Sequence, residues 1–165
     1  MEHYFVYIRL KPFIRQWVEH AFGRPVRFPA RSPENAFLRR HVRLRPPGAV
    51  PDVDGDDLTP IVLPKQADRK VEFWNYLTDD DRRELCLMID GLFTMAWYAD
   101  LREQLMRPGI NTAVHEWCRK NGISIDYEDT VIQRINRWRR ECQKNGVNLF
   151  FKPKKVKSHQ KRVQR

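Results

Sequence analysis

The sequence predicts an α+β protein whose carboxyl-terminal part is helical. In the first half of the chain, short stretches rich in β-branched and aromatic residues, such as residues 4–10 and 59–64, alternate with short amphipathic segments. From residue 94 onwards, apolar residues recur with the helical period. We therefore expect an α+β domain over residues 1–92, a three-helix unit over residues 93–147 and a disordered basic tail over residues 148–165.

The amino-terminal elements have clear boundary signals. Residues 4–10 (YFVYIRL) predict a strand, and a helix is expected to begin at Pro12 and to end before Gly23. Residues 25–29 (PVRFP) are bracketed by prolines and predict a short edge strand. Ser32 is expected to cap a second helix, with the proline that follows it at the first helical position.

The middle of the chain combines a long loop with predicted helices. Residues 44–60 are dense in Pro, Gly and Asp and predict a surface loop that leads to the second strand. Thr78 is expected to cap a helix whose first turn is acidic. Gly91 is expected to separate this helix from another over residues 94–106, which ends before Pro108.

Two more helices are predicted after Pro108. Asn111 is expected to cap the first, and the Asn-Gly pair at residues 121–122 is typical of its end. Asp126 is expected to cap the last helix, over residues 127–144. Six residues, 121–126, would then connect the two helices.

The charge is strongly positive and unevenly distributed. The formal net charge is +10 and the pI is about 9.9. Counted along the chain, residues 1–45 carry +7, residues 46–107 carry −6 and residues 108–165 carry +9. Basic ends of this kind indicate a polyanionic partner such as nucleic acid.

Cysteine use and hydropathy limit the cellular setting. Three widely spaced cysteines do not predict a disulfide framework, and we expect a reducing cytoplasm in which they act as small hydrophobic residues. No segment has the pattern of a signal peptide or the apolar length of a membrane span. We expect a cytoplasmic protein, associated with the nucleoid of a bacterium, and no membrane partner.

The predicted last helix has two different faces. At about 100° per residue, an apolar stripe gathers on one side: Val131, Ile135, Trp138 and Cys142. The opposite side carries amides and cations: Gln133, Asn136, Arg137, Arg140 and Lys144. Arg134 and Arg139 lie at the two edges of the stripe. One face can therefore anchor the helix while the other meets a polyanion.

The last two predicted helices fit the layout of a helix-turn-helix, whose second helix enters the major groove of DNA. The tryptophans Trp97, Trp117 and Trp138 recur at intervals of 20 and 21 residues, one in each of the last three helices. Through them, residues 94–144 loosely resemble tri-helical Myb/SANT-like modules.

A second resemblance covers more of the chain. The stretches YFVYIRLKPFIRQWVEHAFG, NAFLRRHV and FWNYLTDDDRREL resemble small basic proteins encoded on bacterial prophages and conjugative elements. The resemblance implies a mobile-element context. It supplies no activity, cofactor or catalytic residue.

Catalytic and metal-binding patterns are weak. In DVDGDD, residues 52–57, the glycine is fourth and Leu63 stands twelfth, whereas a calcium loop needs glycine sixth and glutamate twelfth. His115 and Cys118 are one helical turn apart, but no second pair with ligand spacing accompanies them, which favours a buried cysteine beside a surface histidine. No phosphate-binding glycine loop or nucleophile signature occurs. We expect no enzyme activity, no cofactor and no metal.

Six amino-terminal arginines have two possible uses: Arg27, Arg31, Arg39, Arg40, Arg43 and Arg45. They could form a second phosphate-contacting surface, or they could neutralise the acidic middle block. The second use is slightly favoured, because a block of −6 follows one of +7.

The function we predict is binding of double-stranded DNA, in a regulator of transcription or replication on a mobile element. The helix over residues 127–144 would enter the major groove. Side chains that suit base edges are Gln133, Asn136, Arg137 and Arg140. Side chains expected on phosphates are Arg134, Arg139, Lys144, Lys152, Lys154, Lys155 and Lys157.

Two alternatives stay open. The first is a protein-interaction adaptor, which would use the amino-terminal aromatic residues and the acidic loop to bind another protein, with the basic tail incidental. The second is RNA binding, which requires exposed aromatic rings for base stacking. The helical spacing of Trp117 and Trp138 points these rings inward, which makes RNA the weaker alternative.

Overall fold

The computed structural model describes residues 4–105 and 107–147, and within them five helices and four short strands. The helices are α1 (Pro12–Phe22), α2 (Pro33–His41), α3 (Asp79–Leu101), α4 (Ile110–Lys120) and α5 (Ile125–Lys144). The strands are β1 (Phe5–Ile8), β2 (Arg43–Leu44), β3 (Thr59–Val62) and β4 (Trp74–Tyr76). The expected combination of helix with strand is confirmed. The predicted tail over residues 148–165 lies outside the described residues.

The strands form two small antiparallel sheets. β1 pairs with β3, with Phe5 opposite Val62, and β2 pairs with β4. Val26 adds one parallel bridge to Ile61, so residues 25–29 do not form the predicted edge strand. β2 and β4 were not predicted, because strands of two and three residues are too short to show an alternating pattern.

Local capping signals set the starts of the first three helices. α1 begins at Pro12 and is followed by Gly23, as predicted. The Ser32 hydroxyl accepts a hydrogen bond from the backbone of α2 at 3.1 Å. Thr78 and Asp81 cap α3 reciprocally, since each side chain bonds the other residue's backbone N–H. All three predicted helix starts are confirmed.

The starts of the last two helices differ from the prediction. α4 begins after Gly109, which has a left-handed φ of 86°, and not at Asn111. α5 begins after Ser124 and not at Asp126. Neither helix has a side-chain hydrogen bond at its N-cap, so the local polar residues were poor guides to these two boundaries.

α3 runs unbroken through Gly91, and the prediction that this glycine separates two helices is wrong. Ile89 and Phe93 are both fully buried on either side of it. Their packing outweighs the cost of a helical glycine, which is about 1 kcal/mol relative to alanine. The predicted boundary between residues 92 and 93 falls inside α3, which contacts α1 and α2 as well as α4.

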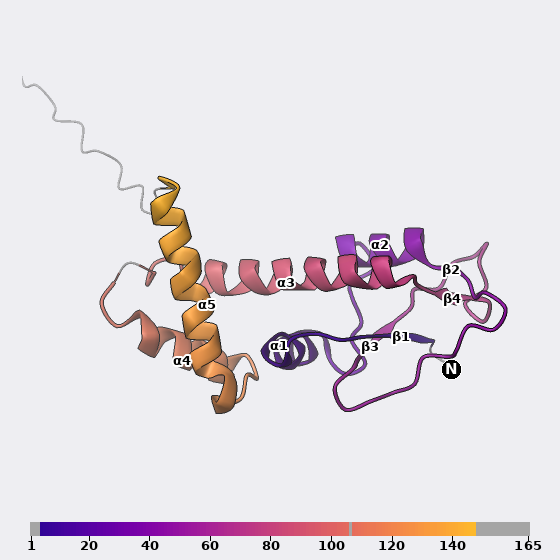
Figure 1. Cartoon of the computed structure of the whole chain (residues 1–165), viewed down its shortest axis with the longest axis horizontal. Helices are drawn as coiled ribbons and strands as arrows, with labels where there is room; N and C mark the ends of the chain where they lie inside the picture. Colours follow the sequence, from indigo (N-terminus) through magenta and orange to yellow (C-terminus); the bar gives the residue numbers. More distant parts are fainter. Residues whose placement is uncertain (1–3, 106, 148–165) are drawn as a thin grey trace, which may run out of the picture.

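A single hydrophobic core extends along α3. The Phe93 ring lies 5.5 Å from Phe13, 5.5 Å from Trp17 and 5.7 Å from Trp117, measured between centroids. These partners come from α1 and α4, so the core joins both ends of the chain. Figure 1 shows α3 as the long axis of the molecule, with α1 and the β1–β3 pair on one side and α5 standing across its carboxyl-terminal end.

Candidate nucleic-acid interface

The apolar side of α5 anchors the helix on the rest of the protein. Val131 and Ile135 are fully buried, as the sequence predicts. The half-buried Trp138 ring lies 5.1 Å from Trp97 and 5.5 Å from Tyr98, in edge-on contacts with α3. The helix begins two residues before the predicted range and ends where predicted, at residue 144.

The turn between α4 and α5 is shorter than expected. It contains four residues, 121–124, whereas the sequence predicts six. Gly122 has a φ of 75°, and a Cβ there would lie 2.8 Å from the His20 side chain of α1. The Ser124 backbone N–H donates to Gln16 Oε1 at 2.9 Å. The turn therefore rests on α1, and its length agrees with the three to four residues usual in helix-turn-helix motifs.

The opposite side of α5 is open and polar. Six residues line a shallow depression of about 570 Å³ and are here called the α5 ridge: Gln133, Asn136, Arg137, Arg139, Arg140 and Gln143. Gln133, Arg137 and Arg140 are exposed, and so is Lys144 beyond the ridge. The sequence did not single out Gln143, although its wheel position about 20° from Asn136 could have revealed it.

Two ridge residues hold each other in place. Arg139 donates from Nη1 to Asn136 Oδ1 at 2.9 Å, and both side chains are half-buried. Asn136 also donates from Nδ2 to Asn111 Oδ1 at 3.5 Å, which links the ridge to α4. An amide group has two donor hydrogens and two acceptor lone pairs. Asn136 thus keeps one donor and one acceptor for a further partner.

Arg134 is placed differently from the prediction. Its guanidinium donates to both carboxylate oxygens of Asp90 on α3, at 3.0 Å for Oδ2, and to Thr94 Oγ1 at 3.2 Å. It also lies over the rings of Phe93 and Phe13, 5.5 and 6.0 Å from their centroids. These contacts explain its position at the edge of the apolar stripe. They give Arg134 a structural role within the fold, and its predicted phosphate contact stays a prediction.

The amino-terminal end of α5 has the opposite charge. Asp126 and Asp129 are exposed near its first turn, and Glu128 is almost fully buried. A hydrogen bond from His115 lowers the pKa of Glu128, which also accepts from Arg119 Nε at 3.2 Å. This charge cluster fixes α5 against α4 and leaves the cations to the second half of the helix.

The pair considered as metal ligands is divided between two environments. Cys118 is buried, as predicted, and burial raises the pKa of its thiol to about 12. His115 faces Glu128 instead. Across residues 4–105 and 107–147, no cluster of three or more His, Cys, Asp or Glu is arranged to hold a metal ion.

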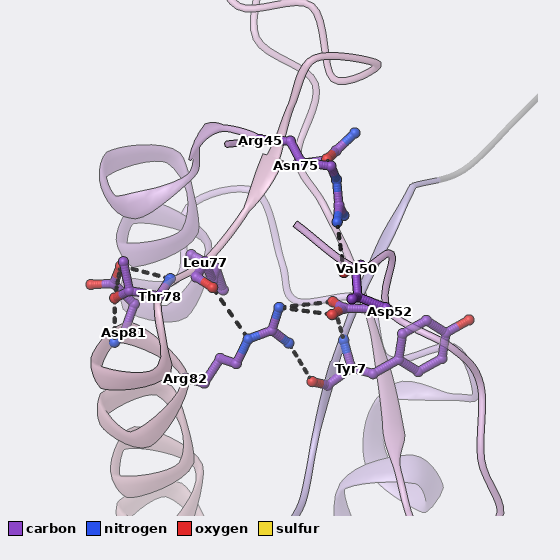
Figure 2. A network of polar contacts seen from close by, with 9 residues as sticks. All are labelled: Tyr7, Arg45, Val50, Asp52, Asn75, Leu77, Thr78, Asp81 and Arg82. Carbon is purple, nitrogen blue, oxygen red and sulfur yellow. Dashed lines mark hydrogen bonds and ion pairs between the residues drawn. The ribbon is translucent and has the colours of Figure 1, made fainter. Parts of the chain in front are cut away.

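The acidic loop serves as an anchor within the fold. Asp52 accepts two hydrogen bonds from Arg82 Nη2, at 2.8 and 3.0 Å, and Arg82 Nη1 donates to the Tyr7 carbonyl at 2.6 Å (Figure 2). Asp54 pairs with Arg24 at 3.3 Å. The carboxylates of this segment thus hold the loop to β1, to α3 and to the turn that follows α1.

The six amino-terminal arginines neutralise little of the acidic block. Arg43 is 3.9 Å from Asp81, whereas Arg45 donates to Asn75 and Arg39 donates to Asn35. In the part of the chain that is described, the side chains of Arg31 and Arg40 make no ion pair or hydrogen bond. The favoured use of these arginines is therefore supported for Arg43 and not for Arg31, Arg39, Arg40 or Arg45.

The remaining predicted phosphate contacts lie beyond the described part of the chain: Lys152, Lys154, Lys155 and Lys157. No helix within residues 4–105 and 107–147 combines the length and the apolar content that crossing a membrane requires. Comparison of the chain with protein-family models, curated proteins and solved structures finds no match. The two resemblances therefore stay predictions, and the α5 ridge is the feature that bears on function.

Proposed function

We propose that the protein binds double-stranded DNA by placing the α5 ridge in the major groove. The observation that carries this proposal is a helix held by α1, α3 and α4 whose open side presents a continuous row of arginines and amides. Arginine can pair bidentately with guanine, and glutamine or asparagine with adenine. A rigid base for such side chains favours reading of sequence as well as attraction to phosphates.

The charge distribution along α5 determines how the helix would dock. Helix-turn-helix proteins usually direct the start of the recognition helix at the bases, whereas homeodomains use the middle of theirs. The exposed carboxylates of Asp126 and Asp129 would repel phosphates near the start of α5. We therefore propose that the second half of the helix, from Gln133 to Lys144, lies in the groove.

The roles of individual residues follow from their exposure. Gln133, Arg137 and Arg140 are free to reach base edges, with Asn136 beside them. Arg139 and Lys144, together with the lysines of the tail, would contact phosphates. In this proposal the protein regulates transcription or replication, and the predicted resemblance implies that it does so on a mobile element.

Salt-dependent binding tests the proposal. Fluorescence anisotropy with random and candidate operator duplexes should show a log affinity that falls steeply with log salt, by about 0.9 per phosphate contacted. Arg137→Ala is expected to reduce discrimination between sequences. Lys155→Ala should weaken every duplex equally and flatten the salt slope by about one unit.

Arg83→Ala provides the matched control, because Arg83 is exposed at the far end of α3 from α5. It should bind like the unmodified protein. Equal, sequence-independent losses in Arg137→Ala and Lys155→Ala would reduce the proposal to nonspecific DNA coating. Absence of binding at low salt would contradict it.

One observation favours a protein-interaction adaptor as the second candidate. Leu44, Val50 and Phe73 are 54%, 81% and 62% exposed. They lie close together, because Arg45 bonds the Phe73 and Val50 carbonyl oxygens at 3.1 Å and directly follows Leu44. An exposed apolar group of this kind can bind another protein. This candidate takes precedence if no duplex binds.

A further inference from the structure

Gly91 stands at an exposed position of α3 where nothing in the described chain requires a glycine. Its φ is not positive, and a Cβ built there would meet no atom within 4 Å. A helix with a glycine in its interior is less stable than the same helix with alanine, because glycine loses more conformational entropy on folding. Absence of a side chain at this exposed position lets another group approach the α3 backbone closely.

The surface around Gly91 is apolar in the middle and charged at its ends. Leu87 and Met95, one turn before and one turn after the glycine, are 72% and 69% exposed. With about 100° per residue, six exposed residues fall within about 40° of the Gly91 direction. We call them the α3 stripe: Asp80, Glu84, Leu87, Gly91, Met95 and Arg102.

The α3 stripe is complementary to a reversed copy of itself. Leu87 and Met95 are each four residues from Gly91, and Asp80 and Arg102 are each eleven residues from it. If two α3 helices cross antiparallel at Gly91, Leu87 faces the partner's Met95 and Asp80 faces the partner's Arg102. In a parallel pair, by contrast, Asp80 would face the partner's Asp80.

We propose that a second copy of this chain packs its α3 stripe antiparallel against the first, with the two helices in closest contact at Gly91. The arrangement has twofold symmetry, in which each contact occurs twice. The missing side chain allows the two backbones to approach, and the neighbouring Leu87 and Met95 side chains fill the space on either side. This packing explains why the Leu87 and Met95 side chains are exposed in the single chain.

α5 packs beside the proposed interface. It reaches α3 through Arg134, which binds Asp90 and Thr94, and through Trp138, which packs on Trp97 and Tyr98. Asp90 and Trp97 lie about 100–120° from the Gly91 direction, whereas Tyr98 lies about 20° from it and forms the border between α5 and the α3 stripe. The proposed dimer does not depend on DNA binding, although it would present two α5 ridges related by the twofold axis.

The oligomeric state of the full chain tests the inference. Sedimentation equilibrium at micromolar concentrations should give a mass of twice 19.9 kDa. Gly91→Gln introduces a bulky side chain that suits a helix, and should raise the dissociation constant of the dimer at least about tenfold. The same substitution should raise the thermal midpoint of the isolated chain, because glycine is replaced by a better helix former.

Ala36→Gln, at an exposed position of α2, is the control for added bulk and should dimerise like the unmodified protein. A charge exchange supplies the second test. Arg102→Glu should weaken the dimer, because it faces the partner's Asp80, and adding Asp80→Arg should restore it.

Three results would overturn the inference. They are a single-chain mass at every concentration, unchanged dimerisation of Gly91→Gln, and failure of the charge exchange to restore the dimer. Circular dichroism checks that each variant is folded. Since mass is measured without DNA, failure of this inference is distinguishable from failure of the proposed function.

Discussion

Replacing Arg134 with alanine is expected to destabilise the fold by about 2–3 kcal/mol. The side chains of Arg134 and Asp90 are 23% and 29% exposed, so their pair is largely shielded from water. Hydrogen bonds to charged groups contribute about 1.5–3 kcal/mol each, whereas exposed ion pairs contribute about 0–1 kcal/mol. The free energy contributed by this partly buried bidentate pair should lie between that of one and that of two such hydrogen bonds. Its loss also leaves the Asp90 carboxylate without its main partner.

Urea unfolding measures this change. With a slope of about 2–3 kcal/mol per molar, the midpoint of Arg134→Ala should fall by about 1 M. Arg137→Ala is the matched control, since it removes the same side chain from an exposed position of the same helix. Its free energy of unfolding should change by less than about 0.5 kcal/mol. DNA binding should show the reverse order, with Arg137→Ala the more affected variant.

The effect of Arg134→Ala should depend on pH. Hydrogen bonding from Arg134 is the main cause that lowers the pKa of Asp90 in the folded protein. A carboxylate whose folded pKa is lowered adds stability above its unfolded pKa, about 3.9 for aspartate, and this stability is lost as the pH falls through the folded value. The difference in free energy of unfolding between the unmodified protein and Arg134→Ala should therefore be largest at neutral pH and should shrink below about pH 4.

Equal stability of Arg134→Ala and Arg137→Ala would refute the structural role of Arg134. If Arg134→Ala also lost DNA binding while staying fully stable, the original sequence-based prediction of a phosphate contact would be the better interpretation. A difference in stability that persists unchanged at low pH would show that ring packing, and not the Asp90 carboxylate, accounts for the effect.

Three further substitutions test local parts of the fold. Thr78→Ala removes the reciprocal cap of α3 and should lower the free energy of unfolding by about 1 kcal/mol in urea titrations, whereas no change would argue against that cap. Gly122→Ala forces alanine into a left-handed φ of 75° and against His20, and should lower the thermal midpoint; an unchanged midpoint would show that the turn is free to move. Glu128→Gln should destabilise the protein at neutral pH and progressively less as the pH falls below the ordinary glutamate pKa, because the Glu128 pKa is lowered in the folded state. A loss of stability that is the same at every pH would contradict the ionised Glu128 inferred from this contact.

Much of the helical structure was predictable because its signals are local. Pro12, Ser32 and Thr78 act on backbone groups within their own first turn, and each begins a helix as predicted. The buried side of α5 follows from the spacing of Val131 and Ile135 alone. These interactions join residues that are close together in the chain, so the local sequence is enough to predict them.

Other features depended on residues far apart in the sequence. Gly91 ends a helix by local propensity, but the packing of α3 on α1 and α4 keeps the helix continuous. The brief strands β2 and β4 have no pattern of their own and are recognised only through their pairing. The connection between α4 and α5 is shorter than predicted because α5 begins at Ile125, before the polar residue that was expected to cap it.

By itself the sequence determined that a basic, amphipathic helix would lie near the carboxyl end with its cations and amides on one side. Only the tertiary structure decided which of those cations remain available. The sequence places Arg134 at the edge of the apolar stripe and Arg137 opposite it, but it does not show that Asp90, 44 residues away, binds Arg134 and leaves Arg137 exposed. The physical reason is that burial and ion pairing act between groups brought together by folding, and a one-dimensional pattern records only the spacing along the chain.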